Sequence, residues 1–179
     1  MNILHVTQGY SPAIGGTEWL IQRVSEELVS RFDDRVTVFT TDRLNVQGFV
    51  RPFSPRLPTG WEKINGVNIR RFRVWNGFGP FLKVAQYAAY RLNIPYNDTL
   101  RSLYSGPVIP GFEDAIRKYP SDLIGAASFP LLHMFAAQEA ARRSRRPCVF
   151  TGCLHPEDRW GFQRRQIHWA VRKADAYVA

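Results

Sequence analysis

Two adjacent glycines near the amino terminus are the first residues of this sequence whose chemistry can be inferred. Gly15 and Gly16 follow an apolar run over residues 2–7 and precede an amphipathic segment that begins at Thr17. Because glycine has no Cβ, a ligand can approach its backbone closely, and the amino terminus of a helix favours negative charge. The pair therefore predicts a site for a phosphate-bearing ligand. The sequence contains neither the Gly-x-Gly-x-x-Gly pattern of dinucleotide sites nor a P-loop motif.

A second group of polar residues lies between residues 152 and 160. His155 is followed closely by Glu157 and Asp158. An imidazole beside a carboxylate can act as an acid or base, or hold a sugar hydroxyl. Alternatively, the two acidic residues begin a helix, because carboxylates are favoured in the first turn. Both interpretations remain open at this stage.

The elements that would position these residues alternate between strands and helices. Apolar and β-branched runs predict strands at residues 2–7, 35–41, 61–64, 67–74, 122–127, 147–151 and from 176 onward. Amphipathic patterns predict helices at residues 17–32, 81–93, 112–119, 130–143 and 160–173. Residues 43–60 form a long connection with three prolines, and residues 96–111 are expected to be irregular.

This alternation predicts an α/β fold: a Rossmann-like, three-layer α/β/α domain with a mainly parallel sheet. Ligands bind such sheets beyond the carboxyl ends of the strands, a rule that also makes Asp42 and Ser128 candidates. The first helix is expected to bury the apolar residues Leu20, Ile21, Val24 and Leu28. His5 is expected in the sheet, and His133 and His168 on helix surfaces.

The opening pattern Tyr10-x-Pro12-x-x-Gly15-Gly16-x-Glu18 resembles the amino-terminal opening of GT-B glycosyltransferases of family 4. Three later segments resemble further motifs of that family, so the resemblance covers nearly the whole chain: Asn65-Gly66-Val67, Asp122-Leu123-Ile124 and Ala174-Asp175-Ala176. The resemblance implies that residues 1–179 are the acceptor-side Rossmann-like domain, one half of a GT-B fold. The C-terminal domain that binds the nucleotide sugar is then absent from this chain.

The resemblance also implies an activity. The full-length enzyme would be a retaining glycosyltransferase that moves a sugar from a nucleoside diphosphate sugar to a hydroxyl acceptor, either a saccharide or a lipid-linked group, and the isolated chain would be inactive. The donor phosphates would face Gly15 and Gly16, and no cofactor is needed besides the nucleotide-sugar substrate. Residues expected to contact the acceptor or the sugar are Tyr10, Glu18, Ser128, Glu157 and Asp158.

One departure from the family concerns histidine. Many members carry His-x-His after the strand at residues 122–127, where this chain has Gly125-Ala126-Ala127. His155 lies near the place where many members have a later histidine, and it is therefore the expected catalytic residue. Two alternatives to a glycosyltransferase remain: a non-catalytic α/β module that associates with membranes, and a sugar epimerase of the GT-B fold.

The amino-acid composition limits the classes of binding partner that we expect. Lys and Arg number 24 against 15 acidic residues, a net charge of +9 that favours anionic partners such as nucleotide sugars or phospholipid head groups. The basic residues are dispersed and no nucleic-acid motif is present, so nucleic acid is not an expected partner. Cys148 and Cys153 are separated by about 16 Å of extended chain, too far for a disulfide. A reduced, cytoplasmic protein without a bound metal is expected.

The segment at residues 81–93 has two interpretations. Its apolar residues share one arc of the helix, so it can pack on the sheet. Alternatively, it lies at the surface of an anionic membrane, with tyrosines at head-group depth. The residues expected on that membrane face are Phe81, Lys83, Tyr87, Tyr90 and Arg91. The second interpretation predicts a peripheral protein at the inner face of the membrane, as a lipid-linked acceptor would require.

Overall fold

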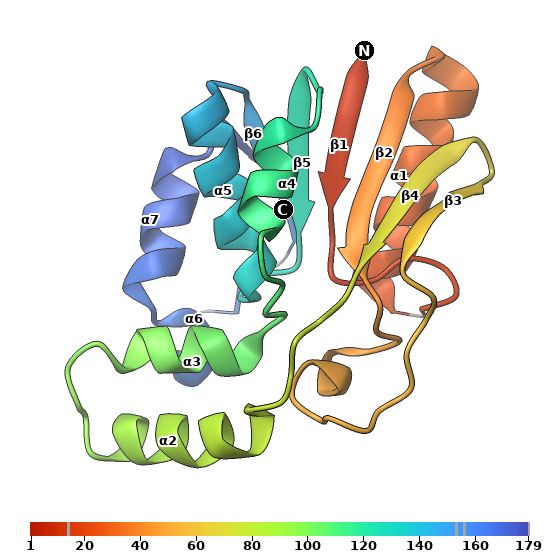
Figure 1. Ribbon diagram of the computed structural model, residues 1–179. Coiled ribbons are helices and arrows are strands. Elements are labelled where there is room, and N and C mark those ends of the chain that lie inside the picture. Colours follow the sequence, from red (N-terminus) through yellow and green to blue (C-terminus); the bar gives the residue numbers. More distant parts are fainter. Residues whose placement is uncertain (14, 153, 156, 179) are drawn as a thin grey trace.

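A computed structural model describes residues 1–13, 15–152, 154–155 and 157–178 (Figure 1). The strands are β1 (Asn2–Val6), β2 (Arg35–Thr41), β3 (Gly60–Ile64), β4 (Val67–Phe72), β5 (Leu123–Ala127), β6 (Cys148–Thr151) and β7 (Ala176–Val178). The helices are α1 (Gly16–Phe32), the short 3₁₀ helix η1 (Val46–Phe49), α2 (Gly79–Arg91), α3 (Asn97–Ser105), α4 (Phe112–Lys118), α5 (Leu132–Ser144), α6 (Arg159–Phe162) and α7 (Arg165–Lys173).

The seven strands form one sheet in the order β3-β4-β2-β1-β5-β6-β7. All neighbours pair in parallel except β3 and β4, which form the predicted hairpin. The chain runs from β1 outward through β2 on one side and later through β5 on the other. The strand order therefore reverses between β1 and β5, the point at which open α/β sheets bind ligands. The predicted Rossmann-like α/β fold with a mainly parallel sheet is confirmed.

Successive side chains of a strand point to opposite faces of the sheet, so the strands contribute to two apolar layers. Ile3, Val36 and Val38 pack with Leu28 and Val29 of α1 on one face. On the other face, residues of β1, β2, β5 and β6 pack with α4, α5 and α7 in the larger core, which includes Leu4, Phe39, Ile124, Met134, Phe150 and Ile167. Figure 1 shows α1 on the opposite side of the sheet from α4 and α5.

Polar contacts close the amino edge of the sheet, by which we mean the end at which the parallel strands begin. The Asp122 carboxylate accepts a hydrogen bond from the Asn2 amide at 2.7 Å, and the amino terminus forms an ion pair with Asp34 at 2.6 Å. The Arg146 guanidinium donates to the carbonyl oxygens of Ile116, Arg117 and Tyr119. These contacts hold the loops on which the strands begin.

Helix α1 buries only part of the predicted face, because Ile21 and Leu28 pack inward as predicted and the other two residues do not. Ile21 and Ser25 are buried, whereas Leu20 and Val24 are exposed. The reason is polar: the Ser25 hydroxyl lies 2.7 Å from Nδ1 of His5 in β1, which turns this side of the helix toward the sheet. His5 is a satisfied core residue, as predicted.

Three other predictions about helices and histidines are wrong. Residues 96–111 contain helix α3, and the helix predicted at residues 160–173 is split into α6 and α7. The break lies where the Arg164 side chain turns into the interior, in extended backbone. His133 is buried rather than on a helix surface, and its Nε2 donates to the Ala127 carbonyl oxygen at 2.7 Å. His168 is exposed, as predicted.

The carboxyl ends of β1, β2 and β5 all point toward one end of the molecule, where α2 and α3 lie (Figure 1). Helix α2 packs against α3 rather than on the sheet, so the prediction that it covers the sheet is wrong. Helices α2 and α3 thus form a separate pair at the end of the molecule where the sheet should bind ligands.

Candidate functional site

The glycine loop at the end of β1 is folded around Glu18. The Glu18 carboxylate is buried and accepts a hydrogen bond from the Gln8 side-chain amide at 2.7 Å. A Cβ on Gly15 would collide with this carboxylate, whereas a Cβ on Gly16 would meet nothing within 4 Å. Gly15 is therefore required by the protein itself, and Gly16 opens to space that a ligand can enter. Glu18 supports the loop and does not lie exposed for a sugar, contrary to its predicted contact.

Two hydroxyl groups lie unpartnered at the reversal point of the sheet. Thr7 follows β1 and Ser128 follows β5, and each side-chain oxygen is buried without a hydrogen-bond partner among the described residues. Ser128 has a left-handed backbone with φ of 91°, and its amide lies close to Gly152 at the end of β6. Buried polar groups without partners are rare because they cost free energy. These two hydroxyls therefore have unused hydrogen-bonding capacity just below the surface at the reversal point.

Tyr10 does not belong to the accessible site. Its ring is fully buried and packs in the smaller apolar core with Ile3 and Val38. Burial raises the pKa of its phenol well above the usual 10. The predicted contact of Tyr10 with an acceptor or sugar needs a surface that this ring does not have in the structure.

The polar group around His155 is more dispersed than the sequence suggests. His155 is exposed and its ring lies edge-on to Phe162, with the ring centroids 5.5 Å apart. Asp158 caps α6, because its Oδ1 accepts a hydrogen bond from the Gly161 amide at 2.8 Å. Glu157 is exposed and forms no ion pair within the described residues. The helix-start interpretation therefore holds for Asp158, and the His155 imidazole has no carboxylate partner in the described part of the chain.

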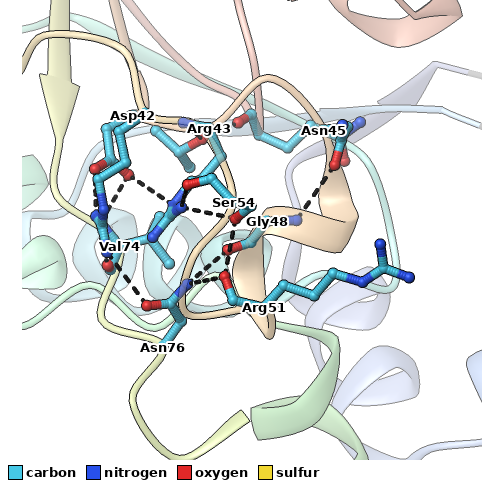
Figure 2. Close-up of polar contacts among 11 residues, drawn as sticks. Asp42, Arg43, Asn45, Gly48, Arg51, Ser54, Val74 and Asn76 are labelled. Carbon is cyan, nitrogen blue, oxygen red and sulfur yellow. Dashed lines mark hydrogen bonds and ion pairs between the residues drawn. The ribbon is translucent and has the colours of Figure 1, made fainter. Parts of the chain in front are cut away.

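The long connection at residues 43–60 is anchored by a network that the sequence does not reveal (Figure 2). The buried Asp42 carboxylate accepts hydrogen bonds from Arg56 at 2.5 Å and from the Val74 amide at 3.0 Å, and it lies 3.4 Å from Nε of Arg43. The Asn76 side-chain amide donates to the carbonyl oxygens of Gly48 and Arg51 at 2.9 and 2.8 Å. Asp42, a sequence candidate for ligand contact, thus ties the long connection to the segment after β4, and Asn76 holds η1.

Next to this anchored loop lies a cavity of about 600 Å³. Its walls come from η1, the amino end of α2, the carboxyl end of α3, the loop after β5, and α6. Its apolar lining includes Val46, Val50, Pro80, Tyr104, Leu131 and Trp160, and its charged residues are Arg51, Lys83 and Asp158. Sequence reasoning missed this cavity because its walls come from segments far apart in the chain, including α3, which the hydrophobic pattern did not predict.

Two buried arginines lie behind the wall of this cavity. Arg101 donates to the carbonyl oxygens of Trp160 and Gln163 at 2.7 and 3.1 Å, and Arg164 donates to the Ser105 hydroxyl at 2.9 Å and weakly to the Trp160 carbonyl oxygen. Burial, together with the neighbouring Arg101, lowers the pKa of Arg164 to about 10. Neither guanidinium forms an ion pair with a carboxylate of the described residues.

Helix α2 presents an apolar face to solvent. Phe81 is 69% exposed, Val84 68%, Tyr87 60% and Leu92 73%, whereas Gln86 of the same helix is buried. Trp160 of α6 donates to the Gln86 side-chain oxygen at 2.9 Å, which explains why the polar side faces inward. Of the predicted membrane face, Phe81, Lys83, Tyr87 and Arg91 are exposed, but Tyr90 is partly covered by Arg101, 5.0 Å from its ring.

The fold of this chain is found among solved structures, whereas the sequence comparisons match nothing. No model of a protein family matches this chain, and no curated protein matches it. The chain is similar to HepE (Alr3699) of Anabaena, whose crystal structure was determined in complex with UDP. The sequences are 17% identical, and the match covers 100% of this chain and 37% of that chain, with a TM-score of 0.45. The present chain thus spans little more than a third of that protein.

The described residues contain no group of three or more His, Cys, Asp or Glu side chains placed to hold a metal ion. None of their helices is both long and apolar enough to cross a membrane.

Proposed function

We propose that this chain is the acceptor-side domain of a retaining, nucleotide-sugar-dependent glycosyltransferase, one half of a GT-B fold. The observation that carries the proposal is the position of the Gly15-Gly16 loop. This loop belongs to the opening pattern that resembles family 4 glycosyltransferases, and it follows β1, beside the reversal point of the sheet, where α/β folds bind ligands. Gly16 is exposed and leaves room for a sugar phosphate, and the buried Ser128 hydroxyl at the end of β5 has no hydrogen-bond partner among the described residues.

In this proposal, the backbone amides at the start of α1 stabilise the charge that develops on the departing diphosphate. A second domain holds the base and ribose of the donor, because Gly15 and Gly16 alone offer only a few hydrogen bonds of about 0.5–1.5 kcal/mol each. His155 binds the donor sugar or acts as a polar catalyst from the loop after β6. The exposed ring of His155 is free to make such a contact.

The test compares two glycine variants of the full-length gene product, with release of nucleoside diphosphate from several nucleotide sugars as the readout. Gly16→Ala fills the open side of the loop, and we expect kcat/KM to fall at least tenfold. Gly77→Ala is the matched control, because its Cβ also meets nothing within 4 Å. Equal activity of the two variants, or no turnover of any nucleotide sugar by the parent protein, would overturn the proposal.

His155→Ala is the second test of this site. If His155 contacts the reacting groups, turnover should fall by roughly two orders of magnitude, the usual scale for a positioned acid–base group. His168→Ala, which removes an exposed imidazole from α7, is the control. A His155→Ala protein that folds normally and keeps near-parental turnover would remove His155 from the mechanism.

A second candidate function, association with an anionic membrane, is favoured by the exposed face of α2. Aromatic and apolar residues there lie beside Lys83 and Arg91, the arrangement of an interfacial helix. Co-sedimentation should increase with anionic lipid in the vesicles and decrease with salt, and Phe81→Ser should weaken it. Phe53→Ser alters a fully exposed phenylalanine outside this face and should not. Equal recovery with neutral and anionic vesicles would reject membrane association and a location at the inner membrane face.

A further inference from the structure

The cavity between η1, α2, α3 and α6 combines an apolar lining with an excess of positive charge. Lys83 and Arg51 are exposed at its rim. Figure 2 shows that the Arg51 side chain extends away from the Asn76 network while its carbonyl oxygen is held by that network. The backbone of Arg51 is therefore fixed and its guanidinium is free to meet a ligand. Asp158 is the acidic residue of the lining, and its carboxylate is engaged in capping α6.

The positive charge continues behind the cavity wall. Arg164 is 1% exposed and is held by hydroxyl and carbonyl oxygens, several of which belong to residues that line the cavity, namely Ser105, Pro130 and Trp160. Arg101 lies beside it, and the carboxylates of Asp98 and Asp158 act on both from beyond ion-pair distance. A buried charge without an ion-pair partner is unfavourable. An anion bound in the cavity would lie one layer from this pair and offset that cost.

The mouth of the cavity joins the exposed face of α2. Pro80 and Lys83 line the cavity, and the adjacent Phe81 and Val84 lie exposed on the same helix. An apolar chain that enters the cavity beside Lys83 can therefore continue along the exposed face of α2. Tyr104 and Trp160 give the inner wall two aromatic rings, 6.1 Å apart in an edge-to-face arrangement.

We infer that this cavity binds a phosphate-bearing amphiphile, with the phosphate between Lys83 and Arg51 and the apolar body along the lining and the α2 face. A free phosphorylated sugar would also supply a phosphate, but it would leave the apolar walls of the cavity without a partner. The role of this ligand as the glycosyl acceptor rests on the proposed function, but its binding does not. Equilibrium binding without any nucleotide sugar therefore tests the cavity independently of the donor site.

The experiment titrates the 179-residue chain with octyl phosphate, octyl glucoside and glucose 1-phosphate, each below its micelle concentration where one exists. Trp160 lies in the cavity wall and reports binding by fluorescence, and calorimetry measures the same mixtures. We expect octyl phosphate to bind at least tenfold more tightly than either other compound, and less tightly as salt is raised. Trp160→Phe should abolish the fluorescence change.

A matched pair of lysine variants locates the phosphate. Lys83→Gln should raise the dissociation constant for octyl phosphate about tenfold, whereas Lys63→Gln, on exposed strand β3, should leave it unchanged. Equal affinity for octyl phosphate and octyl glucoside would overturn the role of the phosphate. Equal affinity for glucose 1-phosphate would show a soluble source and overturn the amphiphile. Absence of a saturable calorimetric signal with all three compounds would reject the cavity as a ligand site.

Discussion

The sheet and the helical layer at its carboxyl end bury opposite kinds of side chain. Between the sheet and α4, α5 and α7, the interior consists of aliphatic and aromatic residues such as Ile124, Met134 and Phe150. In α2 and α3, the buried residues include Gln86, Asp98, Arg101 and Ser102, while Phe81 and Tyr87 are exposed. One chain thus contains an ordinary core and, next to it, a region in which the usual pattern is reversed.

This difference separates stability from function. Buried apolar area stabilises a fold, whereas buried polar groups cost free energy unless they are paired, and exposed apolar groups contribute little. The α2–α3 layer therefore contributes less to folding for its size than the core does. Its Lys83 lines a cavity together with Arg51, which follows η1, and Trp160 of α6. We interpret the reversed pattern of the layer as the requirement of a ligand and a surface partner.

The largest expected effect compares one phenylalanine from each region. Phe150→Ala removes a fully buried ring from β6 and should lower the free energy of unfolding by about 3–5 kcal/mol. Phe81→Ala, on the exposed face of α2, should change it by no more than about 0.5 kcal/mol. Urea denaturation measures both. Similar losses in the two variants would mean that the α2 face is packed and would remove the contrast.

The next effect is a loss of stability at low pH, caused by two histidines that are buried in or beside the sheet. Burial lowers the pKa of His5 and of His133 to about 4, below the 6.5 of the unfolded chain. Between these values the unfolded state binds a proton that the folded state does not, so stability is complete above pH 6.5 and falls as the pH drops toward 4. Each histidine contributes roughly 3 kcal/mol to this loss.

His133→Gln should make the stability profile between pH 6.5 and 4.5 shallower, whereas His168→Gln, at an exposed position of α7, should leave its slope unchanged. Denaturant unfolding at several pH values provides the measurement. A profile that is already flat in the parent chain would show that neither buried imidazole resists protonation.

A smaller effect on stability is expected from the buried Arg164, which lies between α6 and α7 behind the cavity wall. Arg164→Met removes the buried guanidinium and leaves the Ser105 hydroxyl and several carbonyl oxygens without this donor, at a cost of roughly 1–3 kcal/mol. Arg172→Met, on the exposed side of α7, should give no measurable change. An Arg164→Met chain that is more stable than its parent would indicate that the charge is kept for a ligand at the expense of folding, which sharpens the contrast further.

The smallest effect separates the two glycines of the β1 loop. Gly15→Ala must displace the Glu18 carboxylate from its contact with Gln8, and we expect a loss of about 1 kcal/mol. Gly16→Ala adds a methyl group in open space and should stay within about 0.5 kcal/mol of the parent. Thermal unfolding of both variants tests this difference. Equal destabilisation would show that Gly16, too, serves the fold rather than a ligand.

The sequence predicts the sheet well because its strands are β-branched runs bounded by loops, and the Asn65-Gly66 turn marks the hairpin. It fails for α3 because the residues that this helix buries are Asp98, Arg101 and Ser102, which leave no apolar periodicity. It fails in the same way at Arg164, whose inward turn divides a helix that the pattern of residues 160–173 makes continuous.

Only part of the candidate site can be predicted from local sequence patterns. The Gly15-Gly16 loop and the position of Ser128 follow from local pattern and the rule for parallel sheets. The cavity and the Asp42 network do not, because they depend on pairing between residues far apart in the sequence, such as Asp42 with Val74 and Gln86 with Trp160. Local propensity carries no information on such pairs.

The central claim is that the cavity beside the α2–α3 layer is a ligand site. Its most direct test adds octyl phosphate to the ¹⁵N-labelled chain and measures the changes in amide chemical shifts. We predict saturable changes at Val50, Lys83, Ser105 and Gly161, which surround the cavity, and none at the amino edge of the sheet near Asp34 or Ser121. Changes confined to the amino edge, or spread evenly over the exposed surface, would contradict the account.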